Sequence, residues 1–215
     1  MIDNPVEKKL VELEDFRSKL FDLGKQMFEP GKVGLYQLDL LATAVMDRGL
    51  SLIFGFTSQI RANNFTCAAP LVRMHLDNVL RFYAAYISED CHAFTMKVFK
   101  GEHIRNLVDR DGNKMTDRYL VDKMSLEHPW MKKVYENTSG YVHLSNTHIF
   151  NSSRLKDFEK GIIAFSISEQ DRWLTDEDKL EATECMIEIT EILYQYLDGW
   201  NQTKRQSPLS RDTNA

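Results

Sequence analysis

The sequence predicts a mainly α-helical protein, a multi-helix bundle with a small β-hairpin before its C-terminal helix. Several long segments carry apolar residues at every third or fourth position, which is typical of helices with one buried face. Capping residues precede several of these segments. One later stretch, G-I-I-A-F-S-I-S at 161–168, has the β-branched and aromatic content of a strand.

The first helix has clear signals at both ends. Asn4 is a good N-cap, Pro5 suits the first helical position, and Glu7 stands where a capping box places an acidic side chain. Pro30 and Gly31 follow the last apolar residue of the stripe, so we expect the helix to end there.

Further helices are expected along the rest of the chain. The predicted ranges are about 35–63, 65–88 and 91–100, followed by helices beginning after Thr116, at Pro129 and after Thr175, where Asp178 completes a box-like start. Gly49 and Gly55 in the second helix favour close packing. The run D-R-D-G-N-K at 109–114 predicts a turn.

The region before the last helix is expected to change character. Residues 148–152 and 161–168 are predicted to pair as the hairpin, with R-L-K-D-F-E-K between them as an exposed loop. Residues 202–215 are polar and contain Pro208, which predicts a disordered tail. Residues 1–201 are therefore expected to form a single helical domain.

Composition narrows the class of protein. Hydrophobic residues make up 43% and charged residues 27%, which is typical of globular chains. The net charge of −5 excludes an overall basic surplus, so nucleic-acid binding would need a local patch. No run of 18 apolar residues and no signal peptide is found. Three scattered cysteines suggest reduced thiols, and together these features predict a cytoplasmic protein that does not span a membrane.

Two metal-like patterns do not fit a metal site. Residues 109–114 resemble the start of a calcium loop, but Lys114 and Leu120 occupy the positions that require glycine and glutamate. His143 and His148 are five residues apart, which does not place them on one helical face. We therefore expect no metal and no cofactor.

The stretch S-G-Y-V-H-L-S-N-T-H-I-F at 139–150 concentrates polar chemistry. Its candidate catalytic residues are His143, Ser145 and His148, and Tyr141 and Asn146 are candidate ligand-binding residues. No G-x-S-x-G elbow, P-loop or G-x-G-x-x-G motif accompanies them. The chemistry of the stretch is therefore not assigned by motif.

A second set of polar residues lies on the nearly apolar third helix. Arg73, His75, Asp77 and Arg81 need partners or a cavity there, because an unpaired charge is costly in an apolar environment. If Arg73 and His143 line one pocket, an arginine–histidine pair suits a small anion. The alternative is a solvated stripe of ion pairs at four-residue spacing, with structural histidines.

Two separated motifs carry a resemblance. A-A-P-L-V-R-M-H-L-D-N-V-L-R-F-Y-A-A-Y at 68–86 and S-G-Y-V-H-L-S-N-T-H at 139–148 resemble an uncharacterised family of bacterial helical proteins. That family is distantly similar to HEPN (higher eukaryotes and prokaryotes nucleotide-binding) domains, helical bundles that often act as ribonucleases in toxin and phage-defence systems. The R-x-x-x-x-H hallmark of HEPN domains is absent. His143 to His148 keeps its spacing with histidine in place of arginine.

Three functions remain open from the sequence. The first is a ligand- or partner-binding module, self-associating as a homodimer, in which the Arg73–His143 region binds a small anion or a partner. The second, implied by the resemblance, is a ribonuclease or defence effector that acts on RNA. The third is a purely structural interaction protein.

Overall fold

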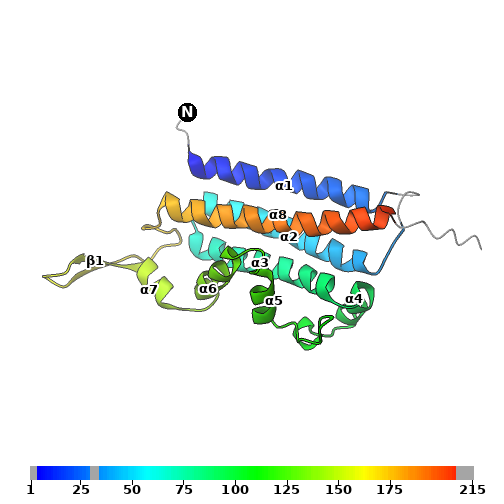
Figure 1. Ribbon diagram of the computed structural model, residues 1–215. Helices are drawn as coiled ribbons and strands as arrows, with labels where there is room; N and C mark the ends of the chain where they lie inside the picture. The colour runs from blue at the N-terminus through cyan, green and yellow to red at the C-terminus, as the bar shows by residue number, and fades with distance from the viewer. Residues whose placement is uncertain (1–3, 30–33, 207–215) are drawn as a thin grey trace, which may run out of the picture.

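The computed structural model describes residues 4–29 and 34–206 and has the predicted mainly α architecture (Figure 1). The long helices lie side by side, and the short elements gather along one flank and at one end. In chain order the elements are α1 Pro5–Met27, α2 Leu38–Arg61, α3 Phe65–Ile87, α4 Cys91–Phe99, the 3₁₀ turn Ile104–Asn106, α5 Asp117–Met124, α6 Trp130–Val142, α7 Asn146–Ser152, β1 Ser153–Asp157, β2 Ile162–Phe165 and α8 Asp176–Gln206.

Helix α1 begins as its sequence predicts. The Asn4 side chain accepts hydrogen bonds from the backbone N–H groups of Val6 and Glu7, at 2.9 and 3.3 Å. The Glu7 carboxylate does not complete a capping box, because it binds the Arg61 guanidinium of α2 at 2.7 Å. The predicted stop at Pro30 and Gly31 lies outside the described residues, and α1 itself ends at Met27.

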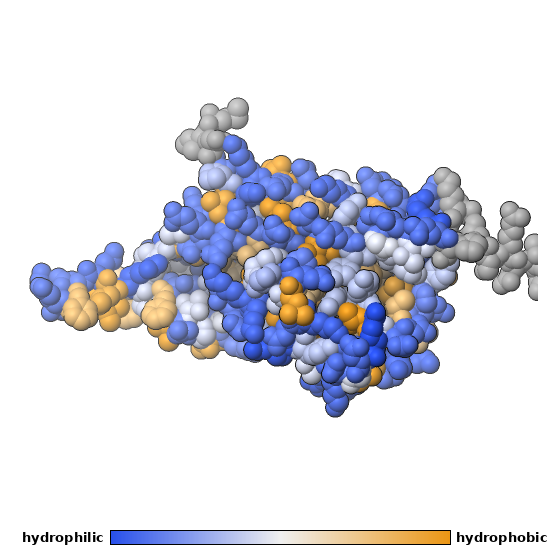
Figure 2. Space-filling view, viewed as in Figure 1, coloured by the Kyte–Doolittle hydropathy of each residue, from blue (hydrophilic) through white to orange (hydrophobic). Residues whose placement is uncertain are grey.

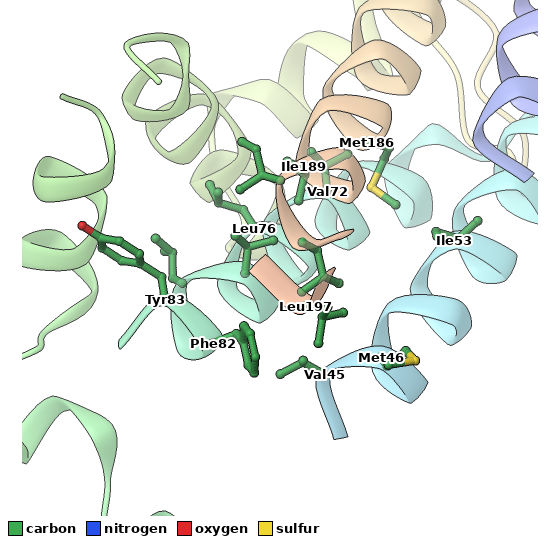
Figure 3. Close-up of a cluster of buried hydrophobic side chains, with 14 of the residues drawn as sticks. Val45, Met46, Ile53, Val72, Leu76, Phe82, Tyr83, Met186, Ile189 and Leu197 are labelled. Carbon is green, nitrogen blue, oxygen red and sulfur yellow. The ribbon is translucent and has the colours of Figure 1, made fainter. Parts of the chain in front are cut away.

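The core forms where α2, α3 and α8 meet, with α1 closing one side against α8 and α2. Figure 3 shows buried side chains from three of these helices converging on one another. Fully burying each large aliphatic side chain contributes about 1.5–3 kcal/mol relative to exposure. The labelled members are Val45, Met46, Ile53, Val72, Leu76, Phe82, Tyr83, Met186, Ile189 and Leu197.

Gly49 allows α2 to approach its neighbours closely, as predicted. A Cβ at this position would lie 3.2 Å from Leu193 Cδ2 and 3.5 Å from the His75 ring. Gly55 has a similar role, since a Cβ there would lie 3.3 Å from Leu71 Cδ1. Both glycines therefore have a packing role.

Helix α8 continues past the predicted boundary, so the expectation of a disordered tail from residue 202 is wrong for 202–206. The Lys204 side chain is buried, and its Nζ lies 2.9 Å from both carboxylate oxygens of Asp39 and 2.7 Å from the Met27 carbonyl oxygen. Asp39 also accepts hydrogen bonds from the Trp200 indole and the Tyr36 backbone. A polar sequence is helical here because its lysine has a buried partner.

The hairpin is present, but its first strand was misplaced. Residues 146–152 are helical in α7, and the segment predicted as a loop supplies β1. Strands β1 and β2 pair antiparallel, with Leu155 opposite Ile163 and a register irregularity before Asp157. Helix α7 and the hairpin, residues 146–165, form a projection that we call the arm (Figure 1).

Both ends of the arm return to the turn between α2 and α3. On the incoming side the Tyr141 ring meets Phe65 edge-on, with ring centroids 5.6 Å apart. On the outgoing side the Asp171 carboxylate accepts hydrogen bonds from the Phe65 and Thr66 backbone, while its own N–H donates to the Asn63 carbonyl. The arm is therefore anchored at a single place on the bundle.

Helix α2 is long and apolar enough by composition to cross a membrane, and it is the one such helix in the described ranges 4–29 and 34–206. In the bundle, 44% of its most apolar window is buried against other helices. Core helices of soluble proteins have the same length and composition, so α2 is weak support for a membrane span.

Candidate functional site

The charged residues predicted on α3 form ion pairs with one another and with two neighbouring helices. Asp77 binds Arg48 of α2 at 3.2 Å and Arg81 at 2.8 Å. Arg81 also binds Asp117 of α5 at 2.5 Å, and Asp117 lies 3.8 Å from Arg73. We call these five residues the arginine–aspartate chain. It contains the Asp77–Arg81 pair that the four-residue spacing predicted.

The guanidinium groups of this chain have partners within the protein. The Arg73 side chain is only 14% exposed, and its guanidinium lies 4.1 Å from the centre of the Tyr135 ring. Burial lowers the pKa of Arg81, but Asp77 and Asp117 outweigh that effect and raise the pKa overall. Because the described carboxylates already neutralise much of this charge, an anion would have to compete with them.

His75 lies apart from the arginine–aspartate chain. It is fully buried, and its Nε2 is 2.9 Å from the Thr190 hydroxyl of α8. Since that hydroxyl donates to the Met186 carbonyl, it accepts from His75, which places the ring proton on Nε2. Nδ1 is buried without a partner in the described structure. Burial, followed by the charge of Arg48, lowers the pKa of His75 to about 3.

Three polar residues of the 139–150 stretch hold local backbone. The Ser139 hydroxyl donates to the Tyr135 carbonyl at 2.7 Å, and the Ser145 hydroxyl donates to the Gly140 carbonyl at 2.7 Å. Nδ1 of His148 accepts the Ser145 backbone N–H at 3.3 Å, which completes a capping box at the start of α7. These contacts fix the bend between α6 and α7.

The other candidates of the stretch differ in exposure. The Tyr141 ring packs edge-on against Phe65 and His148, and burial raises the pKa of its hydroxyl. Asn146, the first residue of α7, and His143, at the C-terminus of α6, are both exposed. Tyr141 lines two cavities of about 160 and 140 Å³. Neither is lined by His143 or Asn146.

Arg73 and His143 do not meet among the described residues. Tyr141 packs against Phe65 and His148 packs against Tyr141, whereas Arg73 lies two turns or about 12 Å beyond Phe65 on α3 and packs against Tyr135. No hydrogen bond or ion pair within residues 4–29 and 34–206 joins the two groups. In place of the expected arginine–histidine pocket, Arg73 belongs to the arginine–aspartate chain, and His143 lies at the bend between α6 and α7.

The arm exposes apolar side chains on an uncommon scale. Exposed fractions in β2 are 50% for Ile162, 51% for Ile163 and 74% for Phe165, and Ile167 just beyond is fully exposed. Figure 2 shows hydrophobic surface along this projection. The other exposed apolar residues of the arm are Ile149, Phe150, Leu155 and Phe158, and Leu144 just before the arm is exposed as well. Large exposed apolar patches on proteins are found at interaction sites, at ligand grooves and on aggregation-prone surfaces.

Sequence reasoning missed two parts of this region. Asp117, which links Arg73 and Arg81, lies more than thirty residues away in the chain, and no spacing rule connects it with α3. The apolar strand was recognised, but its exposure was not predicted. Solvent-facing edge strands normally carry charged residues, so the absence of charge from residue 161 to 168 indicated a strand that is covered by another surface.

Comparison with known proteins adds no identification: no family model, no curated protein and no solved structure matches the chain. The arm projects from the bundle, and its exposed apolar side chains do not pack into the core.

Proposed function

We propose that this protein is a non-enzymatic binding module that acts as a homodimer, with the β2 strands of two copies paired along their free edges. The observation that carries the proposal is the exposed, uncharged β2 edge. A cytoplasmic location and a bacterial origin remain predictions.

The hydrogen-bond pattern of the hairpin supports a free edge on β2. The Ser166 N–H donates to the Ser152 carbonyl at 2.9 Å. Antiparallel pairs alternate between bonded and non-bonded positions, so Ile163 and Phe165 fall at the non-bonded positions opposite β1. Their own N–H and C=O groups are then directed away from β1, toward a second strand.

Charge favours an identical partner strand at β2. Residues 161–168 carry no charge and no proline, the usual features that protect an edge from pairing. A two-fold pairing centred on Ala164 sets Ile163 opposite Phe165 of the second copy, a favourable β-branched and aromatic pair. The same pairing through β1, centred on Leu155, would set Arg154 opposite Lys156 and be disfavoured.

Dimerisation would also stabilise the hairpin of the arm. A two-stranded hairpin with solvent on its faces is marginally stable in water, and independent stability requires three or more strands with a hydrophobic face, which a four-stranded pairing would supply. Pairing would cover part of the isoleucine and phenylalanine surface that one copy leaves exposed.

The choice of a binding module over an enzyme follows from the polar residues at the base of the arm. Ser145 directs its hydroxyl proton to a backbone carbonyl, so no base is placed to activate it. One ring nitrogen of His148 is committed to a helix cap. The ribonuclease alternative is tested by incubating the wild type and the His148→Ala variant with total RNA. Cleavage by the wild type that the variant does not show would favour the enzyme.

The dimer is tested by sedimentation velocity over a concentration series. Ile163→Pro removes the outward N–H of β2 and leaves the bonded positions facing β1 intact, so we expect the wild type to be dimeric and this variant monomeric. Phe165→Lys should also weaken the dimer, because it replaces the Ile163–Phe165 pair with a charge on the paired edge of each copy.

A matched control distinguishes pairing through the β2 edge from non-specific hydrophobic association. Phe158→Lys removes a residue that is 85% exposed in the hairpin turn, outside the β2 edge. It should leave the dimer intact. A monomeric wild type, or equal loss of the dimer in Phe158→Lys and Ile163→Pro, would overturn the proposal.

A further inference from the structure

The opposite end of the bundle contains a concave aromatic surface that the arm does not touch. A cavity of about 650 Å³ lies between the C-terminal part of α3, the connection from α5 to α6, and the last turns of α8. Its walls include Tyr86, Tyr196 and Trp200, and Glu127 stands at its rim. That volume is within the range of small-molecule sites.

The aromatic walls are held in fixed positions. The rings of Tyr86 and Tyr196 lie 5.3 Å apart at 67°, and both contact Tyr83, whose hydroxyl points away from the core in Figure 3. Trp200 packs edge-on against Tyr36 and His92, and its indole N–H donates to Asp39 at 2.8 Å. Because Asp39 is buried with Lys204, the indole has a rigid support.

The charge of the residues that line the cavity favours a positively charged ligand. Among its described lining residues, Glu127 is the acidic one, and neither lysine nor arginine lines it. Aromatic faces present negative potential, which attracts ammonium groups. The net charge of −5 favours the approach of cations as well.

The hydroxyls of the walls are available for a ligand. Within residues 4–29 and 34–206, neither Tyr86 nor Tyr196 makes a hydrogen bond through its hydroxyl, and burial raises the pKa of Tyr196 further above neutral pH. Beside them the exposed Gly199 leaves open space in the wall, since a Cβ there would meet no atom within 4 Å.

We propose that this cavity binds a small organic cation, an alkylated ammonium group joined to an apolar body, with the ammonium over the tyrosine and tryptophan faces and near Glu127. The inference is independent of the arm and of dimerisation. It also reverses the sign of the ligand expected from Arg73 and His143.

The test compares a cation with its uncharged isostere. Acetylcholine and 3,3-dimethylbutyl acetate have nearly the same shape, and their affinities are measured by isothermal titration calorimetry on the full chain. We expect the cation to bind about tenfold more tightly, since a desolvated cation–π contact is worth about that factor. Equal affinities, or no heat from acetylcholine, would overturn the proposal.

Variants locate the binding in this cavity. Gly199→Leu should place a large side chain in the wall of the cavity and abolish binding, whereas Gly199→Ala should retain most of it. Glu127→Gln, at an exposed position, should weaken the binding of the cation several-fold and leave the binding of the isostere unchanged. Unchanged affinity in both Gly199→Leu and Glu127→Gln would place the ligand elsewhere and overturn the proposal. A folded Gly199→Leu variant is verified by its circular dichroism and thermal midpoint.

Discussion

The two ends of α8 lie about 33 Å apart, measured from Asp178 to Trp200, and they handle polar groups in opposite ways. Near Asp178, serine, histidine and aspartate side chains satisfy local backbone, and the exposed chemistry is apolar. Near Trp200, a lysine–aspartate pair is buried beneath a concave aromatic surface whose hydroxyls remain available. The polar stretch 139–150 therefore forms the bend between α6 and α7, whereas the aromatic residues at the end of α8 line the cavity.

The largest expected effect comes from the buried pair at the Trp200 end. Lys204→Ala leaves the Asp39 carboxylate buried without its cation, which should lower the free energy of unfolding by about 3–5 kcal/mol. Chemical denaturation of the wild type and the variant measures the difference.

The matched control lies at the other end of the same helix. Lys179 pairs with Asp176 at 3.4 Å, and that carboxylate is 68% exposed. Lys179→Ala should therefore cost below about 1 kcal/mol. Similar losses for the two lysines would mean that the ends of α8 do not differ in the way described.

The next effect concerns the middle of the bundle and depends on pH. His75 stays neutral in the folded protein to about pH 3, whereas the unfolded chain takes up a proton near pH 6.5. Below pH 6.5 the unfolded state binds more protons, so stability falls with decreasing pH by up to about 1.4 kcal/mol per unit from this residue. Urea unfolding at a series of pH values gives the slope.

Two substitutions separate the His75 contribution from other groups. His75→Gln should flatten the slope between about pH 6 and pH 4. His143→Gln changes an exposed histidine at the arm end and should leave the slope as in the wild type. An unchanged slope in His75→Gln would show that acid acts through other residues.

The smallest expected effect compares two helical glycines. Gly199→Ala should raise the free energy of unfolding by about 0.5–1 kcal/mol, because the new methyl group meets open space. At the arm end, a Cβ on Gly140 would lie 3.3 Å from Thr147 Oγ1 and 3.4 Å from Ser145 Oγ.

Gly140→Ala should therefore give a smaller gain or a loss, since it crowds the capped bend. Thermal unfolding of the two variants side by side measures the difference. An equal gain at both positions would show that the bend has room for a methyl group.

Local signals predicted much of the fold. Asn4, Thr116 and Thr175 cap their helices as expected, because a cap depends on a few neighbouring residues. The first strand was misplaced because His148 serves at the position where glutamate or glutamine usually completes a capping box.

The long-range features were beyond sequence reasoning. Lys204 is buried because Asp39, more than 160 positions earlier, lies beside it, and no periodicity indicates that pairing. For the candidate site, spacing predicted the contact between Asp77 and Arg81 but not their shared partners on α2 and α5. The predicted homodimer stays a proposal, placed on β2, and the small-anion site predicted at Arg73 and His143 stays a prediction, distinct from the cation site proposed in the aromatic cavity.

The anchoring of both arm ends at one turn gives the arm the character of an insertion. Tyr141 and Asp171 contact the same residue, Phe65, so the chain between them leaves and re-enters the bundle at neighbouring points. A short linker could close that gap at low entropic cost. Replacing the arm by such a linker would leave the path of the chain through the helical body unchanged.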